Sequence, residues 1–409
     1  MSAVRPAEDL AATIDRYESF VRADPGNALL WLNLGNLYHR ATRFEEAGAC
    51  FERCLHDHPE VASARSQLAS VRISQNKFDE AERMLRPLLQ DVPEAEADPA
   101  LLFNLGLSLY YQRRWVEAER WFMAAAGRGV GTPECYAYLA RCRHWAGDME
   151  QATEYCQRWV NAARDAESRG YLALLHMDRG DIAEARRLAQ EVLVESPDNS
   201  NAAVVAGTAA IEGQEIAEAS EQFQRVLVRE PDNARAWLGL GLACLYQQHH
   251  PEAITALERA SGLVPDSVGI RVTLGWAIVA AREVRRAEEV FRDAIATDRN
   301  FGEAHGGLAV ALALQMRVDE AREEIRRARG LDPHGFGAVF AHSIILKLQG
   351  QHEQATDILA NLLQQAPRPD GKTLMEQIEI FLRRNPPPPG RALGGPRKGA
   401  APSRPGSGS

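Results

Sequence analysis

Four residues near the start of the chain could together bind a metal ion. Zinc in proteins is most often bound by thiolate sulfur and imidazole nitrogen, which are offered here by Cys50, Cys54, His56 and His58. Their spacing matches neither C-x2-C nor H-x3-H, the spacings of zinc-binding motifs. Both cysteines fall where we expect a helix, so we interpret them as reduced packing residues. We therefore expect no metal site.

A second stretch could bind a phosphate group. Residues 366–373 read APRPDGKT, which fits a relaxed form of the phosphate-binding loop. A working loop of this kind follows a strand and turns its backbone N–H groups toward the phosphates. A helix is expected before this stretch, and Pro367 and Pro369 each lack an N–H group. We therefore expect neither nucleotide binding nor any other cofactor.

Motifs of common catalytic sites are missing from the sequence. It contains no G-x-S-x-G elbow, no H-E-x-x-H helix and no C-x-x-C pair, and its glycine-rich stretch at Gly127, Gly129 and Gly131 is broken. Repeats occupy most of the chain and leave little room for a second domain. We predict no catalytic residue and no enzyme activity.

A regular repeat determines which elements position the remaining candidates. Ten alanines recur at intervals of 34 residues, with single intervals of 37 and 33: Ala47, Ala81, Ala118, Ala152, Ala185, Ala219, Ala253, Ala287, Ala321 and Ala355. Twelve residues before each alanine stands Gly, Ala or Ser, which lets two helix backbones approach closely. Twelve residues after it, proline ends most units, as at Pro59 and Pro231. Each unit is thus predicted to be a helix, a short turn and a second helix.

The units resemble the tetratricopeptide repeat family. The first unit carries every element of the W-x2-L-G-x2-Y…A-x3-F…P pattern, at Trp31, Leu34, Gly35, Tyr38, Ala47, Phe51 and Pro59. The seventh unit keeps Trp237, Leu240, Gly241, Ala253 and Pro265. The resemblance implies an all-α fold, an α-solenoid superhelix of about ten helix-turn-helix repeats.

Four segments follow from this organisation. We predict an N-terminal half repeat over residues 1–27, the repeat array over 28–369, a capping helix over 370–384 and a disordered, basic, Pro/Gly-rich tail over 385–409. The capping helix is indicated by an apolar stripe of Leu374, Ile378 and Phe381, with a capping box of Thr373 and Glu376. The tail has almost no apolar residue to bury.

Charge and composition indicate which classes of partner are excluded. The formal net charge is −9, and the only charged residues after Glu379 are six basic ones, so residues 1–379 carry −15. An acidic array lacks the cations that phosphate contacts need, so we expect no nucleic acid partner. No apolar run approaches 18 residues and the start is polar, which predicts no membrane insertion and a cytoplasmic location. The scarcity of lysine among the basic residues favours a GC-rich bacterial genome.

In the family, the first helix of each unit lines a concave groove. By that resemblance, the groove residues stand one, four, eight, eleven and twelve places after each unit's start. The apolar ones are Phe103, Leu107, Tyr110 and Tyr111 in the third unit, Leu238, Leu242, Leu245 and Tyr246 in the seventh, Val272 and Trp276 in the eighth, Val310 and Leu314 in the ninth, and Phe340 and Ile344 in the tenth. The fourth unit places Glu134, Arg141, His144 and Trp145 there.

These residues predict a protein-binding scaffold or adaptor. An apolar lining suits an amphipathic helix or an apolar peptide of a partner protein. Family analogy extends this to a chaperone-like role in a bacterial secretion or envelope-assembly system. Two alternatives stay open: the lining residues pack against neighbouring units and never meet solvent, or the chain assembles with itself through the groove or the array ends.

Overall fold

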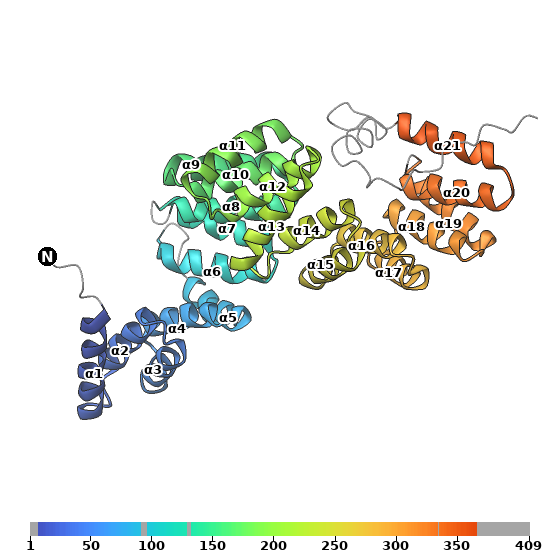
Figure 1. Cartoon of the computed structure of the whole chain (residues 1–409). Coiled ribbons are helices and arrows are strands. Elements are labelled where there is room, and N and C mark those ends of the chain that lie inside the picture. The colour runs from blue at the N-terminus through green and yellow to red at the C-terminus, as the bar shows by residue number, and fades with distance from the viewer. Residues whose placement is uncertain (1–6, 91–95, 129–131, 334, 366–409) are drawn as a thin grey trace, which may run out of the picture. The chain divides into compact units, whose positions relative to one another are not determined.

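The structure is a computed structural model, which describes residues 7–90, 96–128, 132–333 and 335–365 of the chain (Figure 1). Within these residues the chain forms 21 helices and no strand, which confirms the predicted all-α repeat fold. The predicted capping helix (370–384), the tail (385–409) and the phosphate-loop-like residues 371–373 lie outside the described residues.

Helix α1 (Ala7–Ala23) precedes ten helix pairs, and the two helices of each pair are called the first and the second helix. The first helices are α2 (Ala28–Arg40), α4 (Ala62–Ser74), α6 (Pro99–Tyr111), α8 (Thr132–Trp145), α10 (Ala166–Asp178), α12 (Ser200–Glu212), α14 (Ala234–Tyr246), α16 (Val268–Ala280), α18 (Gly302–Leu314) and α20 (Phe336–Leu348). The second helices are α3 (Phe44–Asp57), α5 (Phe78–Leu89), α7 (Trp115–Ala126), α9 (Met149–Ala163), α11 (Ile182–Glu195), α13 (Ile216–Arg229), α15 (His250–Leu263), α17 (Val284–Thr297), α19 (Val318–Leu331) and α21 (His352–Gln365).

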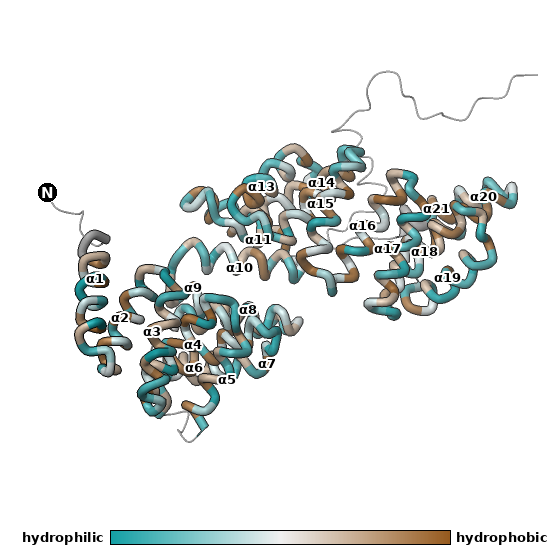
Figure 2. Tube along the Cα trace, turned by 90° about the horizontal axis from the view of Figure 1, so that it is seen from below, coloured by the Kyte–Doolittle hydropathy of each residue, from teal (hydrophilic) through white to brown (hydrophobic). Residues whose placement is uncertain are grey.

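The chain divides into two compact units, Met1–Val205 (unit 1) and Ala206–Ser409 (unit 2), so that α12 contains the boundary. In both units, hydrophobic residues recur along the helices between hydrophilic ones (Figure 2). None of the described helices combines the length and the apolar character that crossing a bilayer requires.

Every first helix is joined to its second helix by three residues, and the middle one has a positive φ. Glycine supplies this conformation at Gly147, Gly180 and Gly350, while the other seven turns use a residue with a side chain, such as Thr42 (φ 59°). So short a connection makes the two helices antiparallel neighbours. The end of each second helix therefore lies near the start of its first helix.

The periodic small residues form the core contacts. All ten periodic alanines are fully buried. In unit 2, the ring of Phe291 lies between two first helices: a Cβ added to Gly275 would come within 2.5 Å of this ring, and one added to Gly307 within 2.2 Å. Phe51 and Gly35 repeat the first of these contacts in unit 1. A phenylalanine on a second helix thus fills the space that a glycine leaves on a first helix.

Candidate functional site

The predicted groove residues lie on the first helices, at the same positions in successive repeats. The last residue of a first helix is exposed in each case where it is large and apolar. These residues are Tyr111 (49% exposed), Trp145 (52%), Tyr246 (39%), Leu314 (44%) and Leu348 (43%). Large apolar side chains that reach solvent at the same position in five of the ten repeats offer a surface to a partner.

Unit 2 carries the longer of these surfaces, here called the apolar strip. It comprises exposed and half-buried residues of α14, α16, α18 and α20: Leu238, Leu242, Leu245, Tyr246, Trp276, Leu314, Phe336, Phe340, Ile344 and Leu348. Several of them, including Leu238, Trp276 and Ile344, pack against one continuous core cluster of unit 2. Half of the strip residues, including the central Trp276, therefore rest on a single packed core.

Two residues predicted to line the groove do not reach its surface. Val310 is fully buried and Val272 is 5% exposed, so neither can contact a partner. Val272 belongs to the unit 2 core cluster, and Val310 lies on α18, whose residues 304–313 are all buried. A Cβ added to Gly337 of α20 would lie 2.6 Å from the backbone carbon of Gly306 in α18, so the two helix backbones nearly touch. The prediction was wrong at these two positions.

Aromatic rings form the centre of the apolar strip. The Trp276 ring meets Phe336 edge to face, with the ring centroids 5.5 Å apart, and meets Phe291 in the same way at 5.7 Å. Phe336 stacks on Phe340 at 5.5 Å. Phe336 is itself 40% exposed, although the sequence analysis did not include it because it is the first residue of its helix. Rings held in this way form a rigid floor for an apolar partner.

A half-buried carboxylate stands beside these rings. Glu303, near the start of α18, accepts a hydrogen bond from the Gly337 backbone N–H at 3.2 Å and one from the Trp276 side chain. Burial raises the pKa of Glu303, and these two hydrogen bonds only partly offset it. Glu303 occupies a groove position of the ninth unit but was missed, because only apolar residues were considered there.

The groove residues of unit 1 are held by their neighbours. Tyr111 stacks on Phe78 with the ring centroids 4.7 Å apart, and Tyr110 meets Tyr138 edge to face at 5.2 Å. Phe103 also meets Tyr138, while Leu107 is half-buried against the same core. Tyr138 was missed because it lies outside the five groove positions.

Polar groups complete this face of unit 1. The Arg141 guanidinium lies 5.1–5.4 Å from the ring centroids of Tyr138, Trp159 and Tyr171. His144 lies 2.8 Å from the Tyr171 hydroxyl and 2.8 Å from the Asp178 carboxylate. These contacts join consecutive repeats, so the predicted polar residues of the fourth unit take part in the packing of the array.

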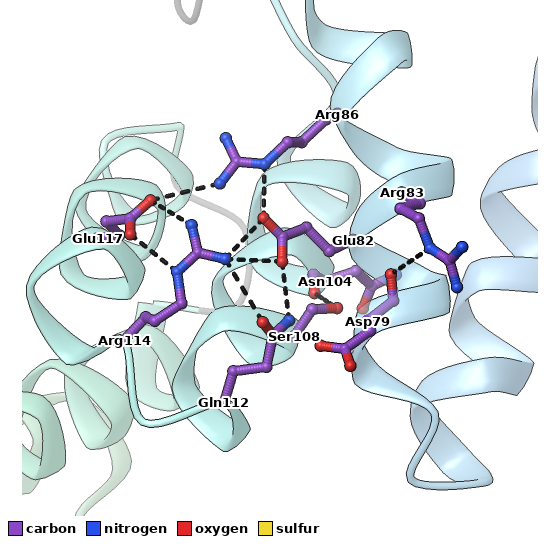
Figure 3. Close-up of polar contacts among 9 residues, drawn as sticks. All are labelled: Asp79, Glu82, Arg83, Arg86, Asn104, Ser108, Gln112, Arg114 and Glu117. Carbon is purple, nitrogen blue, oxygen red and sulfur yellow. Dashed lines mark hydrogen bonds and ion pairs between the residues drawn. The ribbon is translucent and has the colours of Figure 1, made fainter.

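A cluster of polar side chains in unit 1 lies between its second and third repeats (Figure 3). At its centre, Glu82 accepts hydrogen bonds from Arg114 (2.8 and 2.9 Å), Arg86 (2.6 Å) and Gln112 (2.9 Å), and Glu117 pairs with both arginines. Burial raises the pKa of Glu82, but the three partners outweigh it and leave the pKa below its usual value. The cluster is internally satisfied and joins two repeats.

The cysteine and histidine candidates are dispersed. Cys50 and Cys54 are buried free thiols, and burial raises the pKa of Cys50 to about 12. His56 is exposed, and His58 lies 3.1 Å from the backbone oxygen of Gly26. Nowhere in the described ranges do three or more His, Cys, Asp or Glu side chains gather as a possible metal site.

Comparison with protein families identifies the repeat. A tetratricopeptide repeat model matches residues 7–65, 171–219, 204–268 and 272–336, more than half of the chain, and a second model of the same name matches 39–105. The chain belongs to the tetratricopeptide repeat family. No curated protein matches its sequence.

Solved structures share the tetratricopeptide repeat fold. A chain of the APC/C hetero-tetramer Cut9-Hcn1 aligns with a TM-score of 0.54 and 16% identity, over 75% of this chain and 60% of that one. The human IFIT1 dimer with m7Gppp-AAAA aligns with a TM-score of 0.52 and 15% identity, over 84% of this chain and 91% of that one. Because the identities are this low, the likeness concerns the fold alone.

Proposed function

We propose that this protein is a non-catalytic scaffold or adaptor that binds an amphipathic helix or apolar peptide of a partner protein on the apolar strip of unit 2. Tetratricopeptide repeats generally mediate protein–protein interaction and scaffolding. The observation that carries the proposal is the row of exposed apolar side chains around Trp276, supported from below by one core. An amphipathic helix laid across a groove buries such a row.

The proposal also covers the class of partner and the cellular location of the protein. Binding a nucleic acid requires cations that contact its phosphates, whereas the strip is apolar. The proposed partner is therefore a protein and not a nucleic acid. The IFIT1 structure, by contrast, contains m7Gppp-AAAA. We propose a bacterial cytoplasm as its location, by the composition of the sequence. A chaperone-like role in secretion or envelope assembly rests on family analogy.

Affinity capture from an extract of the source cells tests the function. The full chain is compared with the Trp276→Ala, Tyr246→Ala double variant, in which a central anchor is truncated. We expect a specifically retained protein to bind the double variant at least about 30-fold more weakly, since truncation of an anchor costs about 2 kcal/mol or more. The matched control is Val194→Ala with Val228→Ala, two exposed valines on second helices, which should leave retention unchanged.

Two outcomes would contradict the function. If both double variants reduce retention equally, or if neither reduces it, the apolar strip does not bind the partner. A mass that rises with concentration in light scattering of the isolated chain, and that the Trp276→Ala, Tyr246→Ala variant abolishes, would instead assign the strip to self-assembly.

A further inference from the structure

The apolar strip has a charged centre that defines what can occupy it. Glu303 accepts two hydrogen bonds, whereas a carboxylate offers about four lone-pair positions. Among the described residues, no arginine or lysine forms an ion pair with Glu303. A carboxylate held among aromatic rings is stabilised most by a cation placed on its free side. The best occupant therefore combines apolar side chains with a basic group.

The chain leaves unit 2 next to this centre. Helices α20 and α21 pack side by side and antiparallel (Figure 1), so the end of α21 at Gln365 lies near the start of α20, where Phe336 stands. Residues 366–372 can span at most about 25 Å, whereas a helix of the length of α20 measures about 20 Å. Residues that follow this linker can therefore reach Phe336 and Glu303.

The residues after the linker have the required chemistry. The segment 373–384 reads TLMEQIEIFLRR, with its apolar stripe at Leu374, Ile378 and Phe381 and two arginines at its end. Arg383 and Arg384 supply the basic group that Glu303 lacks. A linker of only seven residues holds such a segment at an effective concentration on the order of 1 mM, so an intrinsic Kd as weak as about 10 μM would keep the strip mostly covered.

We propose that residues 373–384 bind on the apolar strip, with Phe381 against the rings of Phe336 and Trp276 and an arginine at Glu303, so that the chain covers its own partner site. A partner must then displace this segment. The inference rests on the proposed function and names how the same strip is regulated. It differs from the capping helix of the sequence analysis, which would cover the last repeat at α21.

A labelled peptide tests this occupancy on the full chain. Fluorescein-labelled peptide 370–385 is titrated, by fluorescence anisotropy, into the wild type and into the Leu374→Ser, Ile378→Ser, Phe381→Ser triple variant. We expect the triple variant to bind the peptide at least tenfold more tightly than the wild type, because its own segment no longer competes. Equal binding to the two chains, or no binding to the triple variant, would overturn the proposal.

Two further variants, made in the triple-variant background, locate the bound peptide. Glu303→Lys, or Phe336→Ala if the first variant fails to fold by circular dichroism, should weaken binding at least tenfold. The control Glu353→Lys changes an exposed carboxylate on α21 and should have no effect. The reverse pattern would place the peptide on the array end as a cap and refute the occupancy of the strip.

The peptide result and the capture result separate the two proposals. If the peptide does not bind but a captured protein still depends on Trp276, only the self-covering segment is wrong. If the peptide binds as expected and no captured protein depends on Trp276, the strip serves the chain itself and the scaffold function is wrong.

Discussion

Two carboxylates on equivalent scaffolds have opposite surroundings. Glu82 in unit 1 receives hydrogen bonds from two arginines and a glutamine, and its pKa is lowered. Glu303 in unit 2 lies beside the Trp276 ring and the Asp332 carboxylate, receives two N–H donors, and its pKa is raised, chiefly by burial. A buried charge whose partners are complete serves the packing of the array, whereas a half-buried one without a cation is available to a ligand.

The same contrast holds for the large apolar residues. In unit 1, the exposed rings of Tyr111 and Trp145 are stacked on Phe78 and Trp115. In unit 2, the exposed ends of first helices α18 and α20 are the aliphatic Leu314 and Leu348, beside half-buried Ile344. Stacked rings occur in both units, as Phe336 on Phe340 shows in unit 2, so the two surfaces differ in the exposed aliphatic residues Leu314 and Leu348 at the ends of the first helices. We therefore expect unit 2 to bind and unit 1 to support.

The largest expected effect comes from breaking the satisfied cluster. Glu82→Gln should lower the free energy of unfolding of the protein by about 2 kcal/mol, because the hydrogen bonds from two arginines lose their anion. Since the folded pKa is lowered, the stabilisation is fully present above the unfolded pKa of about 4.3 and is lost as pH falls through the folded pKa. Urea unfolding followed by circular dichroism should therefore show a larger loss of unfolding free energy in the variant at pH 7 than at pH 3.

A smaller effect is expected where the backbones of α18 and α20 meet. Gly337→Ala should destabilise the protein by about 1–3 kcal/mol, because the added Cβ overpacks against the backbone of Gly306. The control is Gly269→Ala in α16, where a Cβ would meet nothing within 4 Å. That change should be neutral or stabilising, by up to about 1 kcal/mol. Thermal unfolding of both variants compares their melting temperatures with that of the wild type. Equal shifts in melting temperature would show that helix propensity alone, and not the contact with Gly306, determines the effect.

The smallest effect has the opposite sign to that of Glu82. Because the pKa of Glu303 is raised in the folded state, its contribution to stability falls as pH rises through the unfolded and then the folded pKa. In the Leu374→Ser, Ile378→Ser, Phe381→Ser background, the chain's own segment no longer brings an arginine to Glu303. There Glu303→Gln keeps the shape and removes this penalty, so its melting temperature should exceed that of the triple variant at pH 7 and approach it near pH 4. A lower melting temperature at pH 7 in this background would mean that another cation pairs with Glu303.

Most of the fold could be predicted, and part of the site could not. The periodic alanines, the small residues twelve positions earlier and the prolines define each helix pair locally, and the structure has a helix pair at every one. The strip residues were found by position, since Trp276, Phe340 and Ile344 do lie partly open on first helices. Val272 and Val310 occupy the same positions and are buried, because their exposure depends on how closely the next helix approaches.

By itself, the sequence determined the all-α fold, the ten repeats and the apolar character of the first helices, since period and residue size act through local helix formation and nearest-neighbour packing. Only the tertiary structure decided which of those apolar residues reach solvent and which carboxylate stays without a cation. The physical reason is that burial and pKa depend on distances between helices. Those distances are set by contacts such as Gly306 with Gly337, far apart in the chain and close in space.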